Sequence, residues 1–306
     1  MVLVFINFKQ LYKMKRISLI LFLIFNLSFS QISRHQIFDF KTNEPIPFSA
    51  IIITNNEQTS FYSDEKGIFY IDKSKVDSIQ ISSLGYVNLN LHTNLLNDTI
   101  FIVPKVIQLN EIIIKQNHLS TKKIKPKNAK LLFNLTPKSQ LGILVQNKKN
   151  QKNTYLKNIR IPIRNETRTL KKSFNSVFKI HLFSNKNNVP YVPLIDKPFM
   201  IFCNQDSKNF IDINLSEEEI NFNENGFFIC IEMLGEIDND RNLKKNKLVL
   251  PAFEFTNNES DDILITTYSK NYFTRNEQWQ LIEERRSELL GYINFIVGLT
   301  LVTYEN

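Results

Sequence analysis

Short apolar runs separated by turn-forming residues fill the sequence from Ile32 onward, at spacings of about ten residues. The runs SIQIS and VNLNLHT alternate apolar and polar residues with a period of two, as strands that bury one face do. No long apolar pattern of helical period occurs before residue 120, and strand-like runs such as SVFKIHLFS and GFFICIEML follow it. The sequence therefore predicts an all-β chain.

Two segments leave helix open as an alternative. Ser216 and Glu219 have the spacing of a helix-capping box. The polar run NEQWQLIEERRSEL, residues 276–289, is long enough for a short helix or an exposed loop.

An export signal precedes the first strand-like run. Residues 14–30 read MKRISLILFLIFNLSFS, with Lys15 and Arg16 before an apolar stretch and small residues at Ser28 and Ser30. The apolar stretch is shorter than the roughly 20 residues that span a bilayer, although an uncleaved N-terminal anchor is the alternative. We expect residues 1–30 to be a signal peptide with translation starting at Met14. The mature chain is then exported, to the periplasm, the outer membrane or the medium, without a membrane span.

The mature chain carries only a mild positive charge. The full sequence has 38 basic and 30 acidic residues, and residues 1–30 hold four of the basic ones, which leaves 34 − 30 = +4. This excess does not demand a nucleic-acid partner. Part of it lies in STKKIKPKNAK, residues 120–130, which we interpret as the centre of a solvated, Lys-rich linker at 117–137. A patch that rests on anionic envelope lipid or polysaccharide is the alternative.

Residues 32–115 resemble a known family. The segments HQIFDFKTNEPIPFSAIII, SDEKGIF and IQISSLGY are similar, in this order, to the carboxypeptidase-regulatory-like domain of exported Bacteroidota proteins. The resemblance implies a seven-stranded, transthyretin-like Greek-key β-sandwich over residues 31–116 that does not itself catalyse. The matching positions are Ile37, Asp39, Thr42, Glu44, Pro45, Pro47, Asp64, Gly67, Phe69, Ile81, Ser82, Gly85 and Tyr86.

The remainder of the chain, residues 138–306, is expected to form a second β-domain. KIHLFSNKNNVPYVPLI and FIDINLSEEEINFNENGFFICIEML are similar to a β-sandwich that often follows the regulatory-like domain in Bacteroidota surface proteins. We interpret this region as one jelly-roll-like domain.

Catalytic motifs are missing from the sequence. None of the four histidines belongs to an H-E-x-x-H pair, and none of the seven glycines lies in G-x-S-x-G, G-x-G-x-x-G or a Walker loop. We therefore predict no catalytic residue and no organic cofactor.

Few residues suggest a binding site. Glu236, Asp238 and Asp240 could gather oxygen atoms around calcium, although a solvated loop is the simpler interpretation. Asp64 and Trp279 are the other binding candidates, Trp279 because it could stack on a sugar. The two cysteines, Cys203 and Cys230, lie in apolar runs that could be neighbouring strands, so both a disulfide and two buried thiols are open.

Three functional hypotheses follow. The first is an exported, non-catalytic envelope protein that acts as a binding or adaptor module. Its partner would be an envelope protein, such as a TonB-dependent receptor, or a cell-surface glycan. The second is an exported hydrolase of glycan or peptide, with carboxylates in the C-terminal sandwich. The third is a structural role in envelope assembly.

Overall fold

The computed structural model describes residues 32–54, 60–105, 119–126, 128–129, 131–149, 153–165, 173–244, 249–256, 260–271, 278–282 and 294–304. Within these ranges the chain forms strands and a single 3₁₀ turn, η2 (Thr93–Leu95), so the all-β prediction is confirmed. None of these ranges contains a helix of the length and apolarity that crossing a membrane requires. The expected signal peptide lies outside the described residues.

The described part of residues 32–105, here the N-terminal unit, is a sandwich of two small sheets. The three-stranded sheet has the order β4-β1-β7, and the four-stranded sheet has the order β3-β2-β5-β6. Strand β1 runs antiparallel to β4 and parallel to β7. The expected seven-stranded sandwich is therefore present. Its strands are β1 (Ile32–Asp39), β2 (Ala50–Ile53), β3 (Phe61–Tyr62), β4 (Ile68–Asp72), β5 (Ser78–Ser82), β6 (Leu89–His92) and β7 (Thr99–Ile102).

Alternating apolar residues build the core of this unit. Ile37, Phe69 and Ile100 from the three-stranded sheet pack with Ile51 and Ile81 from the four-stranded sheet. Each of these side chains is buried, while its chain neighbours point to the opposite face, as a period of two requires.

The described part of residues 119–304, here the C-terminal unit, contains two larger sheets. The seven-stranded sheet runs β13-β12-β17-β10-β19-β20, with β14 also paired to β12. Its strands are β10 (Ser139–Asn147), β12 (Asn175–Lys186), β13 (Val189–Pro193), β14 (Phe199–Asn204), β17 (Phe227–Glu236), β19 (Ile263–Asn271) and β20 (Gln280–Leu281).

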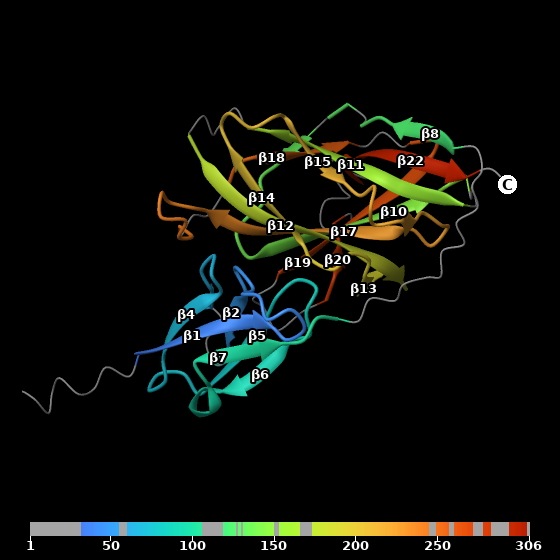
Figure 1. Ribbon diagram of the computed structural model, residues 1–306. Helices are drawn as coiled ribbons and strands as arrows, with labels where there is room; N and C mark the ends of the chain where they lie inside the picture. Colours follow the sequence, from blue (N-terminus) through green and yellow to red (C-terminus); the bar gives the residue numbers. More distant parts are fainter. Residues whose placement is uncertain are drawn as a thin grey trace, which may run out of the picture.

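The eight-stranded sheet of the C-terminal unit runs β21-β18-β11-β22-β8, with β15 and β16 paired to β11 and β9 paired to β18. Its strands are β8 (Leu119–Ile124), β9 (Leu131–Phe133), β11 (Thr154–Arg164), β15 (Phe210–Asn214), β16 (Ile220–Asn221), β18 (Ala252–Thr256), β21 (Asn294–Phe295) and β22 (Gly298–Tyr304). Figure 1 shows the seven-stranded sheet between this sheet and the N-terminal unit.

The two large sheets bury their facing sides against each other. Phe178 and Ile180 of β12 enter one cluster with Ile159 and Ile161 of β11. The rings of Phe178 and Phe253, one from each sheet, meet edge to face with centroids 5.8 Å apart. Dense packing of this kind is the main source of stability in a β-sandwich.

One expectation from the sequence is wrong, and one alternative that it left open is excluded. Part of the expected linker is sheet, because 119–124 pairs with β22 and 131–133 pairs with β18. The capping box at Ser216 does not start a helix: residues 216–218 form a turn, Glu219 has a φ of 47°, and strand β16 begins at the next residue. Pairing with distant strands overrides the local signal in both places.

Apolar loop residues of the N-terminal unit cover the outer face of the seven-stranded sheet. Leu84 packs in a cluster with Phe183 of β12 and Phe228 of β17. Phe48 packs with Val177 of β12 and Leu234 of β17 in a second cluster. The side chains of β12 and β17 that point away from the core of the C-terminal unit are therefore buried by the N-terminal unit.

Two ionisable side chains are buried in this interface between the units. Lys179 of β12 and Glu232 of β17 occupy opposite positions in the register, and each is only 1% exposed. Lys179 Nζ donates hydrogen bonds to the Phe48 carbonyl oxygen at 2.8 Å and to Ser83 Oγ at 3.2 Å. The Tyr62 hydroxyl donates to Glu232 Oε1 at 3.1 Å. All three groups come from the N-terminal unit, so separating the units would remove these partners while the charges remain in the sheet.

Gly85 allows the closest approach between the units. Its φ is +91°, and a Cβ atom at this position would lie 2.6 Å from Nε2 of His181. Only glycine combines this backbone conformation with so short a contact. The imidazole of His181 is fully buried, and its Nδ1 accepts a hydrogen bond from the Leu182 amide at 2.9 Å. The neutral ring therefore carries its proton on Nε2.

We predict that protonation of His181 destabilises the chain in acid. Burial, reinforced by Lys105 and Lys179, lowers the His181 pKa from 6.5 to about 3. The unfolded state therefore binds more protons than the folded state between these values, and stability falls as the pH falls. The expected loss between pH 7 and pH 5 is about 2 kcal/mol in the free energy of unfolding.

Urea denaturation of the wild type and of His181→Gln, each at pH 7 and pH 5, measures this loss. Burial raises the pKa of Glu232, which acts in the opposite direction, but Glu232 is common to both proteins and cancels in their difference. The wild type should lose more stability in acid than the variant. Equal losses would contradict a neutral, buried His181.

Candidate functional site

Cys230, His181 and Glu232 place the residue types of a thiol hydrolase on one face of the seven-stranded sheet. Cys230 lies directly opposite His181 in the register of β17 and β12. All three side chains are buried beneath the N-terminal unit. Burial raises the pKa of the Cys230 thiol and lowers that of His181. A catalytic pair needs the reverse, a thiolate stabilised by an accessible imidazolium, so this cluster belongs to the packing of the interface.

The two cysteines lie in different parts of the C-terminal unit. Cys203 of β14 belongs to the core between the large sheets, whereas Cys230 of β17 belongs to the cluster beneath the N-terminal unit. Strand β12 separates β14 from β17. Both thiols are free, so the disulfide alternative is wrong because the two apolar runs are not neighbouring strands.

We predict that neither thiol reacts in the folded protein. Both are buried, and burial raises the Cys203 pKa to about 11, so thiolate is scarce at neutral pH. Alkylation with iodoacetamide at pH 8, followed by mass measurement, should add no label to the native chain and two labels in urea without reductant. A chain that takes up no label even when unfolded in urea without reductant would indicate a disulfide.

The calcium candidates form a closed turn. Asp238 Oδ1 accepts hydrogen bonds from the backbone amides of Asp240 at 2.9 Å and Asn242 at 2.8 Å, and these bonds lower its pKa. Across the described ranges, no three His, Cys, Asp or Glu side chains gather closely enough to hold a metal ion. Asp238 thus shapes its own loop. Glu236 and Asp240 do not join it in a group that could hold a metal ion.

Asp64 also serves its own turn. Its Oδ1 accepts hydrogen bonds from the amides of Lys66 at 2.8 Å and Ile68 at 2.7 Å. The neighbouring residue Glu65 forms an ion pair with Arg241. This ion pair brings the Asp64 turn of the N-terminal unit next to the Asp238–Asp240 loop of the C-terminal unit, where it forms a contact between the units.

Trp279 packs at the margin of the same interface. It precedes β20, and its ring lies against Gly142 of β10, where a Cβ atom would come within 2.8 Å of Cζ3. Its ring is half-buried beside the cluster that holds Leu84 and Phe228. Sugar stacking on Trp279 stays a prediction.

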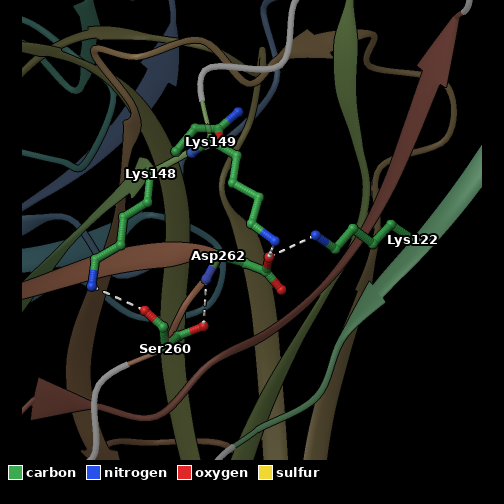
Figure 2. A network of polar contacts seen from close by, with 6 residues as sticks. Lys122, Lys148, Lys149, Ser260 and Asp262 are labelled. Carbon is green, nitrogen blue, oxygen red and sulfur yellow. Dashed lines mark hydrogen bonds and ion pairs between the residues drawn. The ribbon is translucent and has the colours of Figure 1, made fainter.

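A group of lysines converges on Asp262 near β8, a strand that Figure 1 shows on the side of the C-terminal unit away from the N-terminal unit. Lys122 of β8 and Lys149, just beyond β10, both direct Nζ to the same oxygen of Asp262, Oδ1, at 2.6 Å and 2.7 Å (Figure 2). Lys148 Nζ donates to the Ser260 carbonyl oxygen at 3.0 Å. The two lysines lower the pKa of Asp262, so this carboxylate stays ionised and offsets only one of the two charges.

Lys148 and Ser260 also line a small hollow, here the lysine-lined hollow, of about 30 Å³, whereas the Lys122–Asp262–Lys149 cluster lies outside its lining. Its polar lining consists of Lys125, Lys148, Thr256, Ser260 and Asn294, and its other lining residues are apolar. The Asn294 Oδ1 atom is buried and accepts no hydrogen bond from the described residues. The volume suits one functional group of a larger ligand.

Sequence reasoning identified part of this site. The lysine run that includes Lys122 and Lys125 suggested a patch for anionic material as an alternative to a linker. No pattern in the sequence pointed to Lys148 and Lys149. They come close to Asp262 only because β10 pairs with β19, where the Lys148 amide donates a hydrogen bond to the Asp262 carbonyl oxygen.

The described geometry can be set beside known proteins. No protein-family model matches the chain, and no curated protein sequence matches it. Two solved structures of Cwp84, a surface layer associated protein of Clostridium difficile, are similar in part. The structure of its cysteine protease and lectin-like domains has 10% identity and a TM-score of 0.37, over 60% of this chain and 36% of that chain.

The second structure is the clostridial cysteine protease Cwp84 after propeptide cleavage. It has 10% identity and a TM-score of 0.38, over 81% of this chain and 52% of that chain. The chain therefore spans about a third and about half of the lengths of these two neighbours. At these scores the likeness carries no argument about function.

Proposed function

We propose that this chain is an exported, non-catalytic binding module that holds an anionic polymer of the cell envelope at the lysine-lined hollow. The convergence of Lys122 and Lys149 on a single Asp262 oxygen, next to Lys148 of the hollow, carries this proposal. Lys125 and Lys148 line the hollow beside this cluster, so four lysines outnumber two carboxylates, Asp262 and Asp261, of which Asp261 also acts on Lys149. Such a surface attracts polyanions and raises their local concentration.

The cell-surface glycan is the partner that this site favours among those expected from the sequence. An envelope protein would need a larger contact surface than a hollow of about 30 Å³ provides. In this proposal the N-terminal unit is a carboxypeptidase-regulatory-like domain that stiffens the module by docking on the seven-stranded sheet.

Hydrolysis is the less favoured function. The nucleophile and base that the chain offers as a pair, Cys230 and His181, are covered by Leu84 and Gly85 of the N-terminal unit. A substrate would reach them only after the units separate.

Titration of residues 31–306 with anionic polysaccharides by calorimetry tests the proposal. Binding is expected at low salt and should weaken as the Debye length shortens to roughly 8 Å at physiological ionic strength. The double variant Lys125→Ala/Lys148→Ala should bind about tenfold more weakly, because each exposed ammonium contributes Coulomb attraction to a polyanion.

The matched control removes one exposed lysine of the N-terminal unit, Lys41→Ala, and should leave the affinity nearly unchanged. Equal weakening by both variants would mean that net charge, and not the hollow, sets the binding. Absence of binding to any polyanion at low salt would refute the proposal.

A further inference from the structure

We infer that the interface between the two units is an acid-sensitive switch: when His181 takes up a proton, the N-terminal unit leaves the outer face of the seven-stranded sheet while the large sandwich stays folded. The inference goes beyond the proposed function, which does not depend on it. It rests on three features: the hydrogen bonding of the imidazole, the charges around it, and the separation of the interface from the core of the large sandwich.

The hydrogen bonds of His181 leave room for one proton on its ring. Nδ1 accepts a hydrogen bond from the Leu182 amide at 2.9 Å, so the single proton of the neutral ring lies on Nε2. Nε2 is buried and has no hydrogen-bond partner among the described residues. A second proton would have to occupy Nδ1, where it would face the Leu182 N–H group, and the imidazolium would then hold two donors without acceptors. Burying a charged group in this state costs free energy, so protonation opposes docking.

The charges around His181 add to this cost. Burial, together with the positive charges of Lys105 and Lys179, lowers its pKa from 6.5 to about 3. Glu232, the carboxylate of this part of the interface, already faces Lys179. The other ionisable groups of this part of the interface are Cys230 of β17 and Tyr268 and Lys270 of β19.

Glu232 acts in the opposite direction to His181. Burial raises the pKa of Glu232, so the docked state binds its proton more readily than an open state would, and acid favours docking through this group. The sign of the switch at His181 must therefore be measured between proteins that both contain Glu232.

Departure of the N-terminal unit would give the imidazolium access to water. The backbone of Gly85 covers Nε2, since a Cβ atom at this position would lie 2.6 Å from it. Leu84, the preceding residue, packs in one cluster with Phe183 and Phe228 beside the ring. Without Leu84 and Gly85 above it, the ring can turn both N–H groups to solvent, and its pKa returns towards the ordinary value of 6.5.

The interface can open without loss of the large sandwich. Leu84 and Phe48 join the units through two small apolar clusters on the outer face of the seven-stranded sheet. Ile180 and Leu182, the neighbours of His181 along β12, belong instead to the much larger cluster between the two large sheets. Removing the N-terminal unit leaves that larger cluster intact.

The ion pairs at the rim of the interface do little to hold it closed. Glu44 pairs with Lys197 and Glu65 with Arg241, and the four side chains are between 37% and 60% exposed. Exposed ion pairs contribute little to stability, and these lose their negative charges in acid. The buried groups therefore decide whether the units stay docked.

The two thiols report on the interface and the core separately, because Cys230 lies beneath the N-terminal unit and Cys203 between the large sheets. The probe is 4,4′-dithiodipyridine, which reacts with thiols in acid as well as at neutral pH. Residues 31–306 are treated with it at pH 7 and pH 4, and peptide mass mapping locates the label. Cys230 should react much faster at pH 4 than at pH 7, while Cys203 stays protected.

Proton linkage sets the size of the effect. With a pKa of about 3 in the docked state and 6.5 in the open state, the equilibrium constant for opening rises about two-hundredfold between pH 7 and pH 4. Each rate is divided by the rate of the urea-unfolded chain at the same pH. The acceleration at Cys230 in the wild type should then exceed that in His181→Gln, which cannot take up the proton, by at least about tenfold.

The matched control His92→Gln makes the same change at an exposed position of β6 and should behave as the wild type does. If His181→Gln melts well below the wild type at pH 7, His181→Asn, which is smaller and equally uncharged, replaces it. Equal acceleration at Cys230 in the wild type and the His181 variant would overturn the inference. Reaction of both thiols at one rate at pH 4, or a Cys230 as protected at pH 4 as at pH 7, would overturn it as well.

Discussion

The buried pair of Lys179 and Glu232 is the constraint on which the arrangement of the two units depends. A charged group inside a protein is costly unless its hydrogen-bonding capacity is met. The Phe48 carbonyl and the hydroxyls of Ser83 and Tyr62, which form the hydrogen bonds described above with the two side chains, all belong to the N-terminal unit. Apolar contacts alone would allow several relative positions of the two units, whereas these hydrogen bonds form in only one of them. The contact of Gly85 with His181 sets how closely the units approach.

This docking divides the C-terminal unit into a covered side and an exposed side. The outer face of the seven-stranded sheet is occupied by the N-terminal unit, which seals Cys230 and His181 from solvent. The lysine-lined hollow lies between β8, β19 and β21, where the margins of both large sheets meet. The lysine-lined hollow thus lies where the sandwich is open, and the Cys230–His181 pair lies where it is covered.

The sequence predicted the strands well because alternation and turn chemistry are local. Gly67 and Gly85 have the positive φ that their turns suggest, with values of 72° and 91°. It could not predict which alternating polar residues face water. Lys179 and His181 alternate with Phe178 and Ile180, as in any half-exposed strand, yet both polar side chains are buried by another unit.

The lysine cluster around Asp262 was only partly predictable for the same reason. Lys122 finds Asp262 at a sequence separation of 140 residues, and the lysine run has no mark that distinguishes a paired strand from a linker. The two cysteines looked like neighbours because both runs are apolar, and only the strand order places β12 between them. Long-range pairing, which a single sequence does not encode in any local pattern, decides these cases.

A double-mutant cycle on the buried pair tests the central claim most directly. Urea denaturation should show that Lys179→Met and Glu232→Leu each lower the free energy of unfolding by about 3–5 kcal/mol, since each removes the opposite charge that attracts the other inside the buried interface. The double variant should recover most of that loss, because two apolar side chains need no partners. Single variants that cost less than about 1 kcal/mol, as exposed ion pairs do, or losses that simply add, would contradict the claim that this pair fixes the docking of the two units.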